Sequence, residues 1–416
     1  MTIQHNLIPM GSNPSDVKSH NLNAVLLALR RHDYVSRVHL AELTGLSTTT
    51  ITNLISELLE HGIVVEDGGE KLDRQRGVGR PRTALRLVPE ARYAVGVHIG
   101  IGSVRAAVAD LRACLLTCLS LAHPVESSPE EVLTEIAGLV DKAITRSDVD
   151  VRDVVGIGVG ASGLVNPRTG VNILAPNLGW RDVPIRDWFA ERFDLPVCVD
   201  NNVRAMALGE AMSGMGQDVR ALAFVYARIG VGAGLVVDGQ LYRGGGAGAG
   251  EIGHTTIIPD GGEPCRCGNT GCLETLISEP VIVRLAEELA ERDRDSILAT
   301  YLREGEEGPI ERVFAAARAG DTATRAMLDE RARYLGIALA NLVNTLNPEL
   351  IVLGGILDQG QDLILPVAEA TMRRRSFANL GEQVRIQTTS FDWQAGVVGA
   401  AALALNAFFY QRPEIV

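Results

Sequence analysis

One stretch of twenty residues constrains the fold of this chain more than any other. Residues 253–272 read GHTTIIPDGGEPCRCGNTGC and place His254, Cys265, Cys267 and Cys272 among glycines, prolines and polar side chains. A segment of this composition has little apolar surface from which to build a core. One imidazole and three thiolates suit a closed tetrahedral zinc site, which stabilises a loop and leaves no position open for hydrolysis. The sequence therefore predicts one structural zinc ion that holds a glycine-rich loop.

A disulfide is the alternative use of these cysteines, and it needs an oxidising compartment. The N-terminus, MTIQHNLIPMGSNPSDVKSH, has no basic region followed by an apolar core, and no apolar run has the length of a membrane helix. We therefore expect a cytoplasmic protein, without membrane contact, in which disulfides are disfavoured. Cys114, Cys118 and Cys198 lie among apolar residues and are expected to be small buried side chains.

The charge of the chain is unevenly distributed. The 416 residues carry a net charge of −12, yet residues 1–90 hold 10 basic and 10 acidic side chains, so the excess acid lies in the remainder. Residues 71–86 (KLDRQRGVGRPRTALR) hold six basic residues and one acid. A chain of this length suggests two or three domains. The acidic part should repel DNA, whereas the basic segment could attract it.

The N-terminal residues predict three helices and a hairpin. Helices are expected over 21–31 and 37–45, and Ser47 can cap a third helix that ends at Gly62. The segments IVVEDGG and TALRLVP flank the basic run as two strands. The third helix has one apolar stripe, formed by Ile51, Leu54, Ile55, Leu58 and Leu59. This order is typical of a winged helix-turn-helix; the alternative is a small helical domain for protein interaction.

Two groups of residues are candidates for contact with double-stranded operator DNA. The first turn of the third helix carries hydroxyls and an amide that can reach base edges and phosphates in the major groove. These residues are Ser47, Thr48, Thr49, Thr50 and Asn53. Arg80 and Arg82, in the sequence Gly-Arg-Pro-Arg, could lie along a narrow minor groove.

From about residue 90 the pattern changes to short Val/Ile-rich strands, helices and glycine turns, which predicts an α/β chain. Four segments carry a family resemblance: GVGAGLVVDGQLYRGGGAGAGEIGH, CRCGNTGCLE, APNLGW and NPELIVLGG. Through them, residues 20–410 resemble the ROK family of repressors, open reading frames and sugar kinases. The resemblance implies an actin/hexokinase-like fold, with two α/β lobes and a sugar in the cleft. The expected divisions are an N-terminal flexible arm (1–20), the winged helix-turn-helix (21–88) and a ROK sugar-binding domain (89–416). Within the last, lobe I is expected over about 89–205 plus a C-terminal helix over about 395–416. Lobe II is expected over about 206–394 and contains the zinc clip over 254–272.

The resemblance also implies a sugar site beside the zinc. In the family, the zinc-ligating histidine turns its other ring nitrogen toward a sugar hydroxyl, and the metal fixes its orientation. The residues that correspond to sugar-binding positions are Asn177, Asn201, Asn202, Glu251, His254 and Glu274. Either glutamate could instead be an exposed acid of a loop.

Three segments depart from the pattern of the family's kinases. The kinases carry Glu-Asn-Asp-Ala-Asn, with the aspartate as base, where this chain has Asp200-Asn201-Asn202-Val203-Arg204. Asn202 stands at the base position, and an amide cannot take up a proton at neutral pH. The two phosphate loops have become HIGIGS (98–103) and Arg228-Ile229-Gly230. We therefore expect no catalytic residue, ATP or magnesium, although Asp200 is left as an alternative base.

The sequence thus predicts a sugar-responsive transcriptional regulator, most simply a repressor of carbohydrate genes that a sugar or sugar phosphate releases from DNA. A homodimer or homotetramer would place two winged heads on a palindromic operator. The alternatives are an ATP-dependent sugar kinase with a fused DNA-binding domain, and a zinc sensor. The sugar itself stays open. An anionic effector would need a cation near the cleft, for which Arg228 and Arg204 are candidates.

Overall fold

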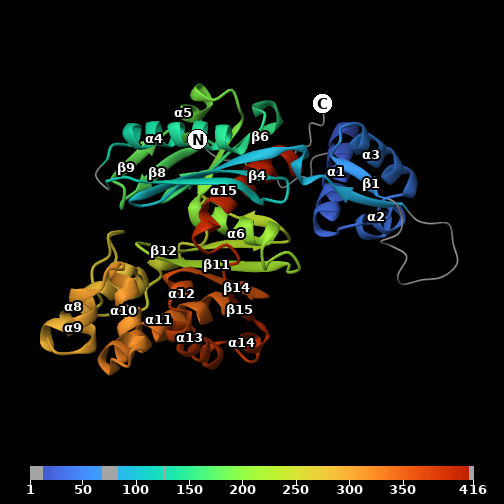
Figure 1. The fold of residues 1–416 in the computed structure, drawn as a ribbon. Coiled ribbons are helices and arrows are strands. Elements are labelled where there is room, and N and C mark those ends of the chain that lie inside the picture. Colours follow the sequence, from blue (N-terminus) through green and yellow to red (C-terminus); the bar gives the residue numbers. More distant parts are fainter. Residues whose placement is uncertain (1–12, 68–82, 125–126, 412–416) are drawn as a thin grey trace.

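The computed structural model describes residues 13–67, 83–124 and 127–411 (Figure 1). Three helices and a two-stranded hairpin form the N-terminal part, which lies beside two larger lobes. Its elements are α1 (Pro14–Arg31), α2 (Arg37–Thr44), α3 (Thr48–Glu60), β1 (Val64–Asp67) and β2 (Ala84–Leu87). The hairpin is antiparallel, and the elements occur in the order expected of a winged helix-turn-helix.

The first helix begins earlier than its apolar pattern indicates. Asp16 accepts a hydrogen bond from the backbone N–H of Asn13 (3.0 Å), and Pro14 occupies the first turn, so a helix start precedes the apolar residues. Residues 14–20 are therefore helical, which corrects the expectation of a flexible arm over residues 1–20; residues 1–12 lie outside the described part. The third helix begins as predicted, because the Ser47 hydroxyl accepts the backbone N–H of Thr50 (3.1 Å).

Lobe I is built on a five-stranded sheet in the order β10-β6-β3-β4-β5. The strands β10, β6 and β3 are parallel, and β4 and β5 pair antiparallel. The strands are β3 (Tyr93–Ile99), β4 (Ser103–Asp110), β5 (Leu115–Ala122), β6 (Val154–Ala161) and β10 (Val197–Asn201). Two helices and a small antiparallel sheet complete the lobe. The helices are α4 (Pro129–Ser147) and α5 (Ile185–Arg192). The sheet consists of β7 (Leu164–Asn166), β8 (Val171–Ala175) and β9 (Trp180–Val183).

Lobe II is built on a second five-stranded sheet, in the order β13-β12-β11-β14-β15. Its strands are β11 (Ala221–Ala227), β12 (Val231–Val237), β13 (Gln240–Tyr242), β14 (Leu350–Gly355) and β15 (Arg385–Thr388). The helices of this lobe, α7 to α14, are Glu274–Ile277, Glu279–Arg292, Ile297–Glu304, Pro309–Arg318, Thr322–Leu346, Ile356–Gln359, Gln361–Arg375 and Leu380–Gln383. Lobes I and II together give the two-lobed α/β architecture that the sequence predicted.

Two helices, α6 (Asn202–Ser213) and α15 (Ala395–Ala404), pack against each other between the two sheets (Figure 1). Glycines also let α15 approach the sheet of lobe I closely: a Cβ on Gly158 of β6 would lie 1.9 Å from the carbonyl oxygen of Ala400, and one on Gly396 would lie 2.5 Å from Nδ1 of His98 on β3. Within the described residues, the stretch Asp392–Tyr410 is long and apolar enough to cross a membrane, yet 72% of it is buried inside the molecule, as in a core helix.

The C-terminal end of α15 meets the N-terminal part of the chain. The helix continues as a π-helix over Leu405–Tyr410, and the Tyr410 hydroxyl donates a hydrogen bond to the backbone oxygen of Leu111 (2.6 Å). The guanidinium of Arg30, on α1, lies 5.1 Å from the centroid of the Tyr410 ring. One continuous helical segment therefore runs from the region between the lobes to the first helix of the winged head.

Candidate ligand cavity, metal centre and nucleic-acid interface

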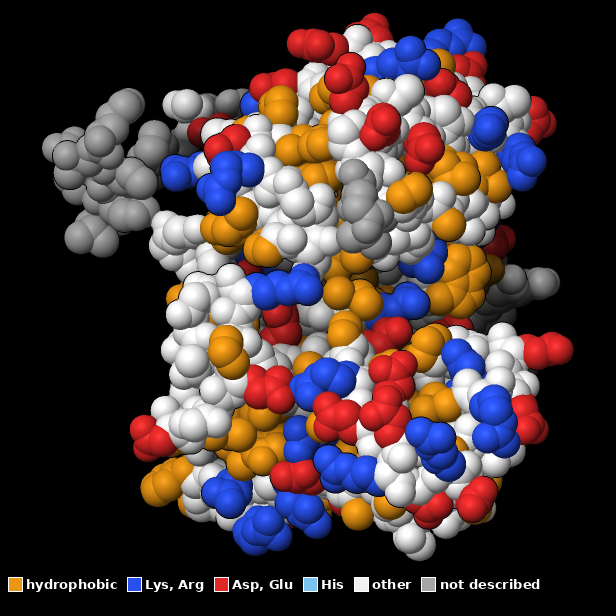
Figure 2. Space-filling view, turned by 90° about the vertical axis from the view of Figure 1, so that its left-hand side faces the viewer, with side chains coloured by type: hydrophobic (Ala, Val, Ile, Leu, Met, Phe, Trp, Pro, Cys, Tyr) orange, Lys and Arg blue, Asp and Glu red, His pale blue; other side chains and the backbone are white. Residues whose placement is uncertain are grey.

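A cavity of about 440 Å³ lies between the lobes, and it contains side chains of both. Figure 2 shows basic side chains along the level where the two lobes meet, with acidic side chains just below them. All six residues that were expected to bind a sugar line this one cavity: Asn177, Asn201, Asn202, Glu251, His254 and Glu274. Residues almost one hundred positions apart in the sequence are thus brought together by the fold.

Hydrogen bonds to the backbone fix the direction of two of these side chains, and a hydrogen bond to a hydroxyl fixes a third. Asn201 ends β10 and caps α6, because its Oδ1 accepts the N–H groups of Val203 (2.9 Å) and Arg204 (3.1 Å). Glu274 begins α7, and its Oε2 accepts the N–H of Val231 (2.9 Å). The Asn202 amide donates to the hydroxyl of Ser162 (3.3 Å). Asn201 therefore has a structural task as well as a place in the cavity wall.

Burial changes the ionisation of two groups in the cavity wall. Burial raises the pKa of Glu251, while the nearby His254 and Arg204 lower it in part. Burial, together with the charges of Arg105 and Arg228, lowers the pKa of His98 to about 3, so this imidazole is neutral at physiological pH. The two pKa shifts therefore have opposite directions, upward for the carboxyl of Glu251 and downward for the imidazole of His98.

The four predicted metal ligands form one cluster beside the cavity. Their ligand atoms all lie within 4.8 Å of one another. The Sγ of Cys265 is 3.6 Å from Nδ1 of His254, and the Sγ atoms of Cys267 and Cys272 are 3.8 Å apart. Atoms bound tetrahedrally at 2.0–2.3 Å are separated by roughly 3.5–3.8 Å, so the cluster fits a zinc-sized ion. Since Nδ1 faces the cysteines and His254 also lines the cavity, Nε2 is the nitrogen left for a ligand.

The remaining cysteines do not all follow the expectation of burial. Cys114 is exposed, and Cys118 and Cys198 are partly buried. Cys114 follows Ala113, whose positive φ of 62° marks the turn between β4 and β5, so its side chain faces outward. Among the described residues, the cluster at His254 is the only group of histidines, cysteines and acids with metal-site geometry.

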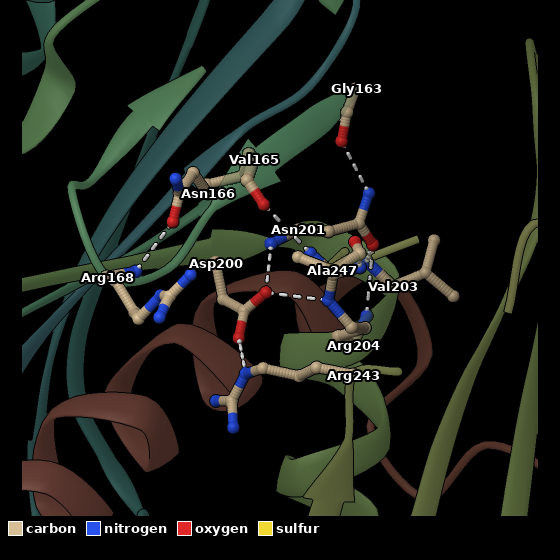
Figure 3. Close-up of polar contacts among 10 residues, drawn as sticks. All are labelled: Gly163, Val165, Asn166, Arg168, Asp200, Asn201, Val203, Arg204, Arg243 and Ala247. Carbon is tan, nitrogen blue, oxygen red and sulfur yellow. Dashed lines mark hydrogen bonds and ion pairs between the residues drawn. The ribbon is translucent and has the colours of Figure 1, made fainter. Parts of the chain in front are cut away.

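Asp200 is engaged in a buried ion-pair network rather than in the cavity (Figure 3). Its two carboxylate oxygens accept hydrogen bonds from Nε of Arg204 and Nε of Arg243, each at 2.7 Å. The guanidinium of Arg204 also donates to the backbone oxygens of Ala247 (2.6 Å) and Val165 (3.3 Å). Arg204, a candidate cation for an anionic effector, is 1% exposed and does not line the cavity, so its guanidinium does not offer a ligand contact there.

The candidate DNA-contacting residues of α3 lie together on one end of the helix. Ser47, Thr48, Thr49 and Asn53 are exposed, and Thr50 is partly exposed because its hydroxyl lies 2.8 Å from that of Ser47. The apolar stripe on the other side of α3 is buried against α1, α2 and the hairpin, apart from the partly buried Leu59. Arg80 and Arg82 lie outside the described residues.

Four further polar residues of the cavity wall were not predicted from the sequence: Arg105, Ser162, Tyr226 and Arg266. Arg266 lies between two metal ligands and donates a hydrogen bond to the side-chain oxygen of Asn177, which joins lobe II to lobe I. Arg105 lies directly opposite His98 in the β3–β4 pairing, on the same face of the sheet. Strand alternation could have placed Arg105 beside His98, but the sequence does not indicate that this face meets the other lobe.

Comparisons with known proteins agree with this architecture. A xylose repressor from Caldicellulosiruptor bescii is 30% identical over 94% of this chain and 96% of the repressor. A glucokinase from Halalkalibacterium halodurans is 35% identical over 75% of this chain and 94% of the glucokinase. The solved structure of a ROK family transcriptional regulator, a homolog of the E. coli MLC protein, superposes with a TM-score of 0.81 at 28% identity, covering 96% of this chain and 98% of the other.

The two regulators are similar to nearly the whole chain, the N-terminal helices included, whereas the glucokinase is similar to three quarters of it. The full-length structural match confirms the predicted fold. The sequence model of the ROK family matches residues 94–407, which contain both sheets, the cavity and the His/Cys cluster. This chain belongs to the ROK family.

Proposed function

We propose that this protein is a DNA-binding transcriptional repressor released from its operator by a sugar, and that it does not phosphorylate that sugar. The observation that carries the proposal is the composition of the cavity. It retains the asparagines, glutamates and histidine that can hydrogen-bond sugar hydroxyls, while an amide, Asn202, stands where the family's kinases carry their base.

The only alternative base that the sequence offered is poorly placed for the task. A general base must come within about 3 Å of the hydroxyl whose proton it accepts. Asp200 is 1% exposed, does not line the cavity, and both its oxygens already accept hydrogen bonds from arginines. We infer that Asp200 is structural, which supports a protein without kinase activity.

A zinc ion fits the proposed function as a structural part of the sugar site. The ion would be held by His254, Cys265, Cys267 and Cys272. It would make this loop a rigid, closed clip rather than a reactive centre. If Nδ1 of His254 held the metal, its Nε2 would be left to face the cavity with a defined orientation. Arg266, which lies inside the clip, contacts Asn177 of lobe I, so the clip also supports contact between the lobes.

In the proposed switch, the sugar binds one of two arrangements of the winged heads more tightly than the other, and this preference controls DNA binding. The polar end of α3 would enter the major groove, and a homodimer would present two such helices. A sugar that closes the cavity releases DNA only if it prefers the DNA-incompetent arrangement; a ~100-fold preference corresponds to about 2.7 kcal/mol. We place the boundary between the DNA-binding head, which includes all of α1, and the sugar-binding domain (89–416) before Pro89.

The test uses an operator selected from random double-stranded DNA by the full chain. Fluorescence anisotropy then measures operator binding while glucose, xylose, glucosamine and N-acetylglucosamine, free and 6-phosphorylated where possible, are added with and without ATP. We expect one sugar to release DNA and to raise the melting temperature without nucleotide. Sugar-dependent ATP consumption clearly above that of a Glu251→Ala variant would overturn the proposal in favour of a kinase.

A further inference from the structure

A second cavity adjoins the one between the lobes. Its volume is about 430 Å³, which is within the range of small-molecule sites. Three residues line both cavities: Pro176, Asn177 and Arg266. The two spaces are therefore neighbours that share one wall, and a ligand longer than a single sugar ring has room on both sides of it.

The shared wall is also a contact between the lobes. Asn177 follows β8 of lobe I, and Arg266 lies between the metal ligands Cys265 and Cys267 of lobe II. The guanidinium of Arg266 donates a hydrogen bond to the side-chain oxygen of Asn177. Arg266 forms no ion pair among the residues that the structure describes, so its other N–H groups are left for water or a ligand.

The rest of the second cavity is built from two parts of lobe I that are distant in the sequence. It is lined by Ser127, Ser128 and Pro129 at the start of α4, and by Leu178, Gly179 and Trp180 between β8 and β9. Trp180 is 2% exposed, so the core of the lobe holds its ring in place. These side chains offer hydroxyls and carbon surfaces without a carboxylate. A sugar ring presents the same combination, a C–H face edged by hydroxyls.

The two hydroxyls at the start of α4 differ in their partners. Ser128 caps the helix, and its Oγ lies 2.8 Å from Oε2 of Glu131. The hydroxyl of Ser127 has no hydrogen-bond partner within the described part of the chain, although this residue is partly buried. Its backbone N–H donates to the oxygen of Pro124 (3.1 Å), which holds the residue at the cavity wall. Ser127 therefore offers both a donor and an acceptor to a ligand.

We propose that the second cavity is a subsite for a second sugar unit, and that the effector of this protein is a disaccharide whose first ring lies in the cavity between the lobes. The first ring rests on the proposed function, whereas the second subsite rests on the cavity beside Asn177 and Arg266. The glycosidic bond would cross the wall at this pair, so the ligand would contact both lobes at the point where they already touch.

The experiment compares single sugars with disaccharides on the full chain by calorimetry. The probes are glucose, xylose and N-acetylglucosamine, and cellobiose, maltose, xylobiose and N,N′-diacetylchitobiose. We expect one disaccharide to bind about 10- to 100-fold tighter than its monosaccharide, because the second ring adds contacts to an association that is already established. That disaccharide should also release operator DNA at a correspondingly lower concentration. In saturation-transfer NMR with the wild type, the protons of both its rings should receive saturation from the protein.

A filling variant separates the two cavities. Ser127→Trp places a large side chain in the second cavity and changes no residue that lines the first. It should weaken the disaccharide about ten-fold or more and leave the monosaccharide unchanged. The matched control is Thr134→Trp, because Thr134 is an exposed residue of α4 that lines neither cavity. This control should bind both ligands as the wild type does.

The outcomes distinguish the subsite from the proposed function. If every disaccharide binds no tighter than its monosaccharide, or if its second ring receives no saturation, the second subsite is overturned while the repressor proposal stands. Disaccharide binding that Ser127→Trp leaves intact also overturns it. If no sugar of either length binds or releases DNA, the proposed function fails and the subsite fails with it. The NMR measurement needs no variant, so it decides the question even if Ser127→Trp does not fold.

Discussion

Replacement of Asp200 by asparagine removes the only negative charge between two arginines. The side chain of Arg204 is 1% exposed and that of Asp200 is 2% exposed, so water cannot replace the lost carboxylate. The side chain of Arg243 is 37% exposed and can turn toward solvent. Breaking one buried ion pair leaves an uncompensated charge and costs about 3–5 kcal/mol of the free energy of unfolding. We expect Asp200→Asn to be destabilised by this amount, chiefly through Arg204.

The measurement is chemical denaturation in urea followed by circular dichroism, with the midpoint and slope compared between variants. The matched control is Asp238→Asn, because Asp238 also pairs with an arginine at 2.8 Å, yet its side chain is 59% exposed and that of Arg220 is 82% exposed. This control should unfold at the same midpoint as the wild type. If Asp200→Asn were as stable as the control, the buried ion pair would not contribute to the free energy of unfolding.

A second variant keeps the test decisive if Asp200→Asn does not fold. The double variant Asp200→Asn/Arg204→Met removes the stranded cation together with its partner and keeps the aliphatic volume. It should be more stable than Asp200→Asn alone. A double variant less stable than the single one would show that the cost comes from lost packing rather than from a buried charge.

Three further predictions concern the metal cluster, the third helix and the response to acid. Elemental analysis should find one zinc per chain, and Cys265→Ser should lose both zinc and sugar binding, whereas the exposed Cys114→Ser should lose neither. Ser47→Ala removes the cap of α3 and should cost about 1 kcal/mol in thermal unfolding and weaken operator binding; unchanged stability would contradict the capping role. The pKa of His98 is lowered from 6.5 to about 3, so only the unfolded chain takes up this proton between those values, and stability should fall with decreasing pH by up to ~1.4 kcal/mol per unit. His98→Gln should show a shallower decline below pH 6.5; an identical decline would refute this assignment.

Sequence reasoning succeeded where the relevant signal is local. The spacing of Cys265, Cys267 and Cys272 already indicated a metal site, and Ser47 before a periodic apolar stripe located the start of α3. The buried strands β3 and β6 were visible as Val-rich runs. In contrast, β5 is largely exposed and does not alternate, so its sequence carries no strand pattern.

The errors arose where partners are distant in the sequence. Arg204 was named as a candidate cation near the cleft, but its side chain donates to Asp200 and does not line the cavity. Arg105 was overlooked because its importance depends on Arg228, which reaches the same cavity from the other lobe. Which charges remain unpaired is a property of the folded arrangement, and a single sequence does not contain it.

The helical segment from Ala395 to Tyr410 has the geometry of a lever. One end touches the ring of His98 through Gly396, and the other lies under Arg30 of the winged head. Sixteen helical residues span on the order of 24 Å, so a ~5° tilt at the cavity end becomes a sideways step of roughly 2 Å beneath α1. In the proposed dimer, a step of that size, doubled by the two-fold symmetry, would be comparable with the rise of one base pair, and it would convert occupancy of a small cavity into a change in the separation of the two DNA-binding heads.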